Sequence, residues 1–552
     1  MKKICKNCRA EFLIEKDDER FYKKIKVPSP RLCPSCRQQR RLSFRNERSL
    51  YHRNCDSSNK KIISIYSSDK SFPVFENNFW WSDNWDAKTY GKDFNFNKNF
   101  FEQFFSLLKE VPKMARIQQG ENENSKFCNC ASYNKNSYLI FSGNQNEDCL
   151  YGTFVNMSKN CLDNFYIINS ELCYECINCD NCYDLIFSQN CKNCSGSAFL
   201  KNCLGCTDCF ACINLQNKKY HFLNKEYSKE EYLKKISTLS LDTFSNLKIS
   251  RENFSKFCTK FPHKYMEGII NENCSGNFIS NSKNSICCFD SDNLEDCSYC
   301  SSSQNIKNCL DVDHYGATQT NELLYECEGV GHGAFNIKFS KLVWGGSSDI
   351  DYCYECFSSK DCFGCTGLKK SQFCILNKQY SREEYFSLRD KIIEHMKQTG
   401  EWGEFFPIEL SPFGYNETVA AEYFPLSKNE VLAKNWKWKE DEEQAKYFGE
   451  KYEIPEKITE TSDEILQKIL ICESCEKNYR IVTSELKFYR KKNLPIPRNC
   501  PNCRHSARMK LRNPRKLFTR NCDNCKVEIS TSFSPERPEK VFCEKCYLES
   551  LE

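Results

Sequence analysis

Cysteine pairs near both ends of the chain have the spacing expected of zinc ligands. Near the start, a Cys-x-x-Cys pair is followed after 24 residues by a Cys-Pro-x-Cys pair; this arrangement returns near the end, and a further quartet follows it. The three quartets are Cys5, Cys8, Cys33 and Cys36; Cys472, Cys475, Cys500 and Cys503; and Cys522, Cys525, Cys543 and Cys546. Four thiolates hold zinc tetrahedrally at about 2.3 Å and leave no position for water, so we predict structural rather than catalytic zinc.

The two chain ends repeat each other beyond the cysteines. FYKKIKVPSPRLCPSCR at 21–37 matches FYRKKNLPIPRNCPNCR at 488–504. The last quartet has an N-terminal counterpart in which only Cys55 remains, with Ser58, Glu76 and Phe79 at the other ligand positions. We expect this second N-terminal site to hold no metal and to depend on apolar packing. The side chains available for that packing are Phe72, Val74, Phe75, Trp80 and Trp81.

These end segments resemble the bacterial probable zinc-ribbon or treble-clef-like zinc-binding domain. The shared features are the Cys-x-x-Cys pair, a following Phe, a Phe-Tyr before the proline-containing stretch and the final Cys-Pro-x-Cys-Arg. The layout of the whole chain is also similar to uncharacterised Cys-rich zinc-binding proteins of small-genome bacteria, some of which carry a CaiB/BaiF coenzyme A transferase label. The resemblance implies zinc binding and no settled activity, and no residue pattern here supports transferase chemistry.

Cysteines in the middle of the chain recur with a period of twelve residues. From Cys149 to Cys212 every cysteine lies a multiple of three residues from every other, and Cys149, Cys161 and Cys173 form one series at twelve. Twelve residues are too few for a helical repeat but suit a narrow β-solenoid with coils stacked about 4.8 Å apart. We therefore predict a mainly β, multidomain chain. Zinc-ribbon or treble-clef modules at both termini flank a duplicated 12-residue-repeat β-solenoid with short capping helices.

Two similar segments end the solenoid halves and define the domain organisation. Ser228 with Glu231, and Ser381 with Glu384, form capping boxes that predict a helix after each half. The predicted divisions are an N-terminal zinc module at 1–82, a helical connector at 83–127, solenoid halves at 128–240 and 258–395, an aromatic and acidic connector at 396–470, and a C-terminal double zinc module at 471–552.

The solenoid cysteines leave two interpretations open. Coils of twelve residues place one Cys-x-x-Cys pair beneath another, and two stacked pairs could enclose an additional metal. The alternative, which we favour, is a ladder of inert core thiols, because free cysteine behaves as a small hydrophobe. The residues concerned are Cys179, Cys182, Cys191, Cys194, Cys203 and Cys206.

An arginine-rich segment follows the first quartet at each end. Residues 37–53 carry six Arg and one Glu, and residues 504–520 carry seven Lys and Arg without an acid. Clustered cations with interleaved aromatic rings suit phosphate contact and base stacking, so RNA or DNA is a candidate partner. The candidate contacts are Arg37, Arg40, Arg41, Arg45, Arg48, Arg504, Arg508, Lys510, Arg512, Arg515 and Lys516. The alternative is a solvated helix face, or an anchor on acidic residues such as Asp441, Glu442 and Glu443.

Composition restricts the remaining possibilities. The chain has 552 residues, 40 of them Cys, and a formal net charge of +5. Because no apolar leader and no run of about 18 apolar residues is visible, we expect a cytoplasmic protein with reduced thiols and no membrane contact. No nucleotide-binding loop, nucleophile motif or small-molecule substrate site is evident. The sequence thus predicts a non-enzymatic zinc-binding protein associated with RNA or the ribosome, or alternatively a protein-interaction scaffold in which zinc is purely structural.

Overall fold

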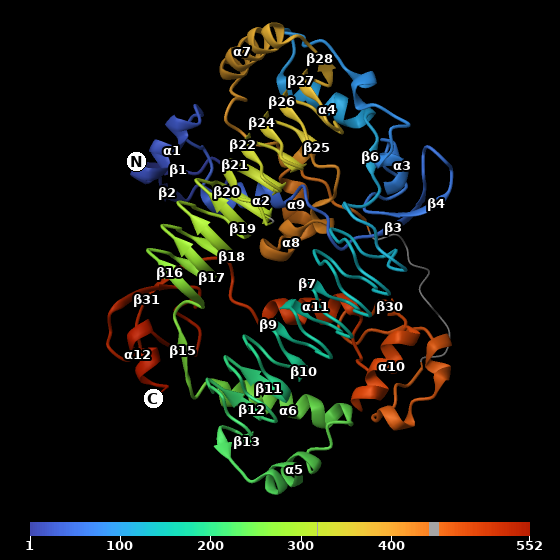
Figure 1. The fold of residues 1–552 in the computed structure, drawn as a ribbon, viewed down its shortest axis with the longest axis vertical. Coiled ribbons are helices and arrows are strands. Elements are labelled where there is room, and N and C mark those ends of the chain that lie inside the picture. The colour runs from blue at the N-terminus through green and yellow to red at the C-terminus, as the bar shows by residue number, and fades with distance from the viewer. Residues whose placement is uncertain (317, 441–451, 552) are drawn as a thin grey trace.

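Two ladders of short parallel strands form the body of the molecule, and the chain ends pack against them (Figure 1). The computed structural model describes residues 1–316, 318–440 and 452–551. The acidic residues Asp441, Glu442 and Glu443, considered above as an anchor for the basic segments, lie outside the described residues. So does the rest of 441–451 within the predicted 396–470 connector.

The first ladder pairs residues that lie twelve positions apart. Isolated parallel bridges begin it, for example Glu123 with Lys135, and the same offset continues through Thr153 with Phe165 and Phe165 with Ile177. Its strands are β7 (Thr153–Asn156), β8 (Phe165–Ile168), β9 (Ile177–Asp180), β10 (Tyr183–Ile186), β11 (Ser195–Lys201), β12 (Phe210–Ile213), β13 (His221–Phe222) and β14 (Lys225–Glu226).

The second ladder is a 13-stranded sheet with the same main offset and local insertions. Gly276 pairs with Cys288, twelve residues on, whereas Leu310 pairs with Tyr325. Its strands are β16 (Gly268–Glu272), β17 (Gly276–Lys283), β18 (Cys288–Glu295), β19 (Ser301–Lys307), β20 (Leu310–Tyr315), β21 (Asn321–Val330), β22 (Phe335–Lys338), β23 (Lys341–Trp344), β24 (Ser348–Asp351), β25 (Tyr354–Phe357), β26 (Lys360–Phe363), β27 (Gln372–Ile375) and β28 (Lys378–Gln379).

A period of three underlies the period of twelve in the first ladder. Left-handed φ values recur at nearly every third residue, for example 51° at Asn160, 58° at Asp163 and 53° at Glu175. Such a turn every three residues points one residue in three to the interior, and the buried series includes Cys149, Cys161 and Cys173. Asn and Asp tolerate left-handed backbone better than other non-glycine residues, which explains their frequency at these positions.

Each chain end folds into two consecutive hairpin-and-helix modules. In the first module of each end, a hairpin is followed by two helices: β1 (Lys2–Ile4), β2 (Glu11–Leu13), α1 (Lys16–Lys24) and α2 (Pro34–Leu42), and at the C-terminus β29 (Leu470–Ile471), β30 (Asn478–Tyr479), α10 (Thr483–Lys492) and α11 (Pro501–Lys510). The second modules contain β3 (Tyr51–Asn54), β4 (Lys61–Ser64), β5 (Val74–Phe75) and α3 (Asn77–Trp81), and at the C-terminus β31 (Phe518–Asn521), β32 (Glu528–Thr531), β33 (Lys540–Phe542) and α12 (Glu544–Glu549).

The second modules join the starts of the two ladders. Strand β5 pairs with β6 (Lys113–Met114), just before the first ladder, and β33 pairs with β15 (Pro262–Lys264), just before the second. The two ends of the chain therefore occupy equivalent places, each beside the beginning of one ladder.

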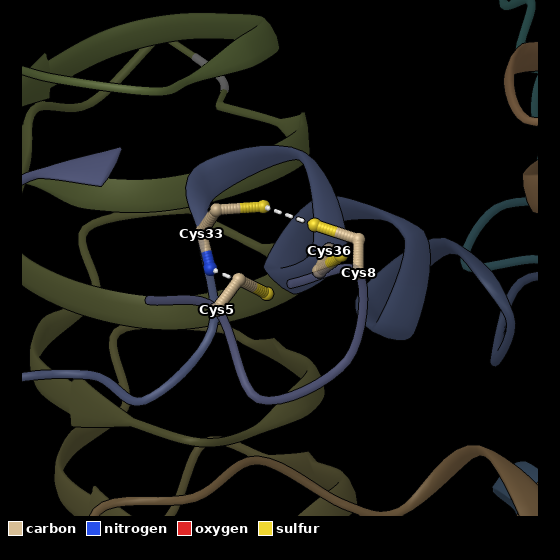
Figure 2. Close-up of side chains that lie close together, drawn as sticks. All are labelled: Cys5, Cys8, Cys33 and Cys36. Carbon is tan, nitrogen blue, oxygen red and sulfur yellow. Dashed lines mark hydrogen bonds between the residues drawn. The ribbon is translucent and has the colours of Figure 1, made fainter. Parts of the chain in front are cut away.

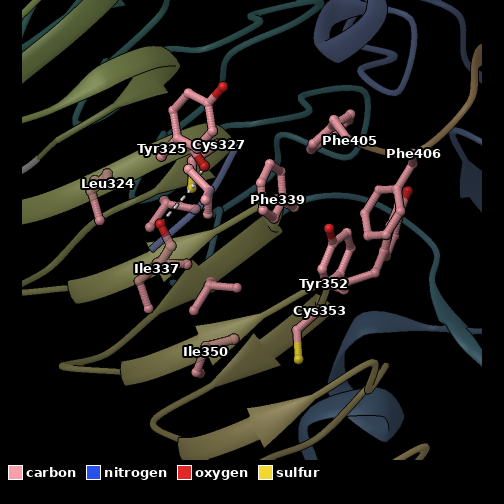
Figure 3. Close-up of a cluster of buried hydrophobic side chains, with 14 of the residues drawn as sticks. Leu324, Tyr325, Cys327, Ile337, Phe339, Ile350, Tyr352, Cys353, Phe405 and Phe406 are labelled. Atoms are coloured by element: carbon pink, nitrogen blue, oxygen red, sulfur yellow. Dashed lines mark hydrogen bonds between the residues drawn. The ribbon is translucent and has the colours of Figure 1, made fainter. Parts of the chain in front are cut away.

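An aromatic core fixes the far part of the second ladder (Figure 3). Phe339 and Tyr352 stack with ring centroids 4.8 Å apart, and Phe406 from the aromatic connector lies next to Tyr352 at 6.4 Å. Helix α4 (Phe100–Glu110) adds Phe100, which meets Tyr352 at 5.2 Å. A helix is thus present within the predicted 83–127 connector, and its apolar face packs on the second ladder.

The predicted helices after the ladders are confirmed. Ser228 accepts from the Glu231 amide at the start of α5 (Lys229–Ser237), and Ser381 accepts from the Glu384 amide at the start of α7 (Arg382–Thr399). Within the described residues, none of the helices combines the length and apolar character needed to cross a bilayer. The predicted domain boundaries stay predictions.

Candidate metal centres and their arginine contacts

The N-terminal quartet converges from a hairpin and a helix start (Figure 2). Cys5 and Cys8 lie in the turn after β1, while Cys33 is the N-cap of α2 and Cys36 lies in its first turn. The Sγ atoms of Cys8 and Cys33 are 3.7 Å apart, and the backbone amide of Cys33 donates to Cys5 Sγ at 3.3 Å. A helix N-terminus stabilises thiolates because its unpaired amides and dipole favour negative charge.

The C-terminal quartet has the same construction. Cys500 is the N-cap of α11, its amide donates to Cys472 Sγ at 3.2 Å, and its own Sγ lies 3.8 Å from that of Cys475. Proline follows the N-cap cysteine in both helices, where its missing amide is not required. The repeated Cys-Pro-x-Cys motif therefore specifies a helix that begins at its metal ligands.

The third quartet repeats this geometry in a shorter module. Cys543 is the N-cap of α12, its amide donates to Cys522 Sγ at 3.3 Å, and its Sγ lies 3.7 Å from that of Cys525. Cys546 completes the set one turn later.

These three quartets fit zinc. In each, all four sulfur atoms lie within 4.8 Å of one another. Tetrahedral zinc with bonds of about 2.3 Å requires sulfur separations of about 3.8 Å, which the observed contacts match. Zinc supplies the bonds that hold hairpin and helix together, and four thiolates close its coordination shell. The protein therefore binds zinc at both ends of the chain.

The second N-terminal module keeps this framework without its ligands. The Glu76 amide donates to Cys55 Sγ at 3.2 Å, as Cys543 does to Cys522, and the Val74 amide donates to Asp56 at 2.7 Å, as Val541 does to Asp523. Apolar side chains occupy the space around it. The buried members are Ile65, Tyr66, Phe72, Val74 and Trp80.

The ladder cysteines are not brought together as a ligand set. In the part of the chain that the structure describes, the terminal quartets are the groups of three or more candidate ligands whose atoms lie within 4.8 Å. The thiols instead donate to backbone carbonyls, for example Cys179 to Ile177 at 3.4 Å and Cys182 to Asp180 at 3.3 Å. Cys191, Cys194, Cys203 and Cys206 are likewise buried, with 2% exposure or less. This placement agrees with a core of protonated thiols.

Most of the residues predicted to contact nucleic acid face the interior, and their assignment needs correction. Six are buried: Arg37, Arg40, Arg41, Arg45, Arg504 and Arg508. The side chains of Arg48, Arg512 and Arg515 are 14%, 7% and 5% exposed. Lys510 and Lys516 are the two members that are exposed. Helices α2 and α11 form the first part of these basic segments, and most of the arginines in the segments face carboxylates of the protein itself.

Helix α2 docks on the second ladder through buried ion pairs. Arg37 Nε lies 2.8 Å from Asp311 Oδ2, and Arg41 Nη1 lies 3.3 Å from Asp311 Oδ1 and 3.0 Å from Glu326 Oε2. Arg40 reaches the same Glu326 at 2.7 Å. Burial raises the pKa of Asp311 to about 6, and the two arginines act in the opposite direction to favour its carboxylate form.

Helix α11 docks on the first ladder in the same way. Arg504 Nε lies 2.9 Å from Asp163 Oδ2, and Arg508 Nη1 lies 3.1 Å from Asp163 Oδ1 and 2.9 Å from Glu175 Oε1. Arg504 and Arg508 follow Cys503 as Arg37 and Arg41 follow Cys36. The C-terminal zinc module thus contacts the first ladder, and the N-terminal zinc module contacts the second.

The aromatic contacts around the docking helices repeat as well. Tyr151 donates to Glu485 of α10 at 2.8 Å and Tyr299 donates to Asp18 of α1 at 3.3 Å. The Arg504 guanidinium lies over the Tyr151 ring and that of Arg37 over the Tyr299 ring, at 4.9 and 5.4 Å. The two docked modules are therefore related by a pseudo-twofold arrangement.

Sequence reasoning missed the carboxylates that receive these arginines. Their signal is present as a second internal repeat: NCLD at 160–163 and 308–311, and YEC at 174–176 and 325–327. Each repeat places an Asp and a Glu at left-handed backbone positions. The twelve-residue cysteine series obscured this pattern, because the second copy contains the insertion between β20 and β21.

Comparison with known proteins identifies the first of these modules. The family model described as a probable treble clef domain matches residues 1–45, which contain the first quartet and α2. No curated protein matches the chain. The similarity of the whole layout to Cys-rich bacterial proteins thus stays an expectation, while the match and the three cysteine quartets together make this a zinc-binding protein with a treble clef module at its N-terminus.

Proposed function

We propose that this protein is a non-catalytic scaffold whose terminal zinc modules lock two β-solenoid halves into one rigid body. The observation that carries the proposal is the reciprocal docking: helices α2 and α11 insert arginines into carboxylates of the ladder that is not adjacent to them in sequence. Zinc fixes the start of each helix, and the helix fixes the coils.

The solenoid part of this proposal rests on register. Parallel pairing at an offset of twelve recurs from Glu123 to Lys219, from Gly276 to Asp313 and again from Ser348 to Ile375. An offset equal to the repeat length is what a chain coiling once per repeat produces. Outer positions of consecutive coils carry opposite charges, such as Lys159 with Glu147 and Lys307 with Glu295, both at 2.9 Å. A regularly spaced, rigid outer surface suits recognition of a protein partner.

The nucleic-acid alternative has weaker support. Phosphate contact requires accessible cations, and of the eleven residues assigned to it, Lys510 and Lys516 are exposed. Releasing Arg508 from Glu175, or Arg41 from Asp313, would remove the ion-pair partner of a buried carboxylate, which costs several kcal/mol. We include in the same proposal that the protein is cytoplasmic and that it binds protein partners.

The salt dependence of single-stranded RNA binding by the full chain distinguishes the scaffold function from the nucleic-acid function. Each phosphate neutralised on a single strand contributes about −0.7 to the slope of log affinity against log salt. The scaffold proposal predicts no retention, or a slope shallower than about −1.5, the value for two lysines. A slope steeper than about −3.5 needs five or more cations and would restore the nucleic-acid function.

A second experiment tests directly for protein partners: crosslinking in the native cell, followed by purification with nuclease treatment. Protein partners should remain after digestion, and crosslinked peptides from this chain should come from the outer positions of the ladders. Crosslinks to nucleotides within α2 or α11 would contradict the proposal.

A further inference from the structure

A large cavity lies between the two docked zinc modules. It has a volume of about 930 Å³ and is lined by residues that follow both zinc helices and by α8 (Val419–Tyr423). Arg48 and Arg515, which occupy equivalent positions after the N-terminal and C-terminal quartets, both contribute to its wall. The cavity therefore lies where the pseudo-twofold relation brings the two ends of the chain together.

The two arginines differ in how their charge is neutralised. Arg515 Nη2 lies 2.9 Å from Asp290 Oδ2, and the same guanidinium donates to Ser301 and Ser302 at 3.1 and 2.6 Å. When the two ladders are aligned on their NCLD repeats at 160–163 and 308–311, Asp290 and Ser302 correspond to Ser142 and Phe154 in the first ladder. A serine, Ser142, therefore stands at the position that corresponds to the carboxylate paired with Arg515.

Arg48 is held mainly by neutral groups. It donates to Thr153 Oγ1 at 2.9 Å and to Asn502 Oδ1 at 3.2 Å, and its guanidinium lies 4.8 Å from the centre of the Phe141 ring. The nearest carboxylate in its ion pairs is Glu422, at 3.9 Å. Burial lowers the pKa of Arg48, as expected for a cation removed from water without a close counter-ion.

The same wall carries a buried histidine with spare hydrogen-bonding capacity. His505 is 4% exposed, its Nε2 lies 3.3 Å from Glu422, and its Nδ1 has no hydrogen-bond partner among the described residues. Glu422 therefore lies between His505, at 3.3 Å, and Arg48, at 3.9 Å. Five Lys or Arg and three Glu line the cavity, which gives it a net positive charge.

We propose that this cavity binds a small molecule bearing a carboxylate or phosphate group, and that Arg48 is the side chain that anchors it. A guanidinium presents paired N–H donors that match either oxyanion, and a partly desolvated arginine gains most from such a partner. Tyr51 and Tyr423 add aromatic surface beside the charged group. This role goes beyond the scaffold and does not depend on it, because the zinc modules dock through other arginines.

Titration of the zinc-loaded full chain with inorganic phosphate and with succinate distinguishes the two oxyanion sources. Isothermal calorimetry should detect one site for at least one of them, and Arg48→Gln should weaken it tenfold or more. Arg20→Gln is the matched control, since Arg20 is an exposed arginine of α1 with the same charge. Zinc content and the melting temperature verify that each variant is folded.

Arg48→Lys separates charge from shape, because lysine keeps the charge but not the paired donors. Retention of part of the affinity in Arg48→Lys supports the proposed anchor. If neither anion binds the wild-type chain at 20 mM, or if Arg48→Gln binds as well as Arg20→Gln, the proposal is overturned.

Discussion

The second modules of the two chain ends share one framework and differ in what stabilises it. At the C-terminus Cys522, Cys525, Cys543 and Cys546 form a zinc quartet. At the N-terminus Cys55 keeps its amide hydrogen bond, and a cluster of buried apolar side chains packs within the module. Trp80 is fully buried there and donates to the Pro112 carbonyl at 3.0 Å. The comparison teaches that this fold can be closed by a metal or by an apolar core.

The largest expected difference comes from removing one cysteine in each module. Cys522→Ser leaves three thiolates, and because metal binding supplies folding energy on the order of 10 kcal/mol in small zinc domains, the C-terminal module should unfold locally. Cys55→Ser should change stability by less than about 1 kcal/mol, because no metal depends on it. Hydrogen exchange of residues 518–549 and 51–81 measures both effects. Equal protection losses in the two variants would remove the distinction.

The next largest loss of stability is expected when a docking arginine is removed, and the loss should be similar at both ends of the chain. Arg41→Ala removes the ion-pair partner of buried Asp313 and Arg508→Ala that of buried Glu175, which costs about 3–5 kcal/mol. The exposed Lys510→Ala is the matched control and should change stability by less than about 0.5 kcal/mol. Chemical unfolding of the zinc-loaded chain measures these values. Near-neutral effects of both arginine variants would show that the docking does not hold the modules in place.

Two equivalent valines should reveal a smaller difference in stability between the apolar module and the zinc module. Val74 and Val541 are equivalent and both fully buried. Val74→Ala should cost about 2 kcal/mol through lost burial, because nothing but packing closes its module. Val541→Ala should have a smaller effect on the protection of its module while zinc is bound. Reversal of that order in hydrogen exchange would contradict the proposed division of roles.

The smallest change in stability is expected from rebuilding the lost site. Ser58→Cys, Glu76→Cys and Phe79→Cys together restore a quartet with Cys55 in a framework that already has the matching hydrogen bonds. We expect one additional zinc per chain with little change in melting temperature, because apolar packing already holds this module together without a metal. Absence of extra zinc would mean that the backbone has moved away from ligand geometry.

The sequence predicted the zinc quartets but not the role of the arginines, and this difference has a physical reason. The zinc quartets were predictable because ligand chemistry fixes residue type and spacing, and the capping boxes because they depend on residues three apart. The twelve-residue register was visible because buried Cys and Ser recur at that spacing. The role of Arg37 and Arg504 was misread because their partners, Asp311 and Asp163, lie far away in sequence, and an exposed basic helix and a docked one have the same local pattern.

The direct test of the account is the amount of zinc bound per chain, measured by elemental analysis of protein purified without chelator. The account predicts three zinc ions in the wild type, three in Cys55→Ser and two in Cys522→Ser. A wild-type count below two would contradict the terminal centres, and a count of five or six would assign metal to the ladder cysteines. Loss of zinc from Cys55→Ser would show that the second N-terminal module is a metal site after all.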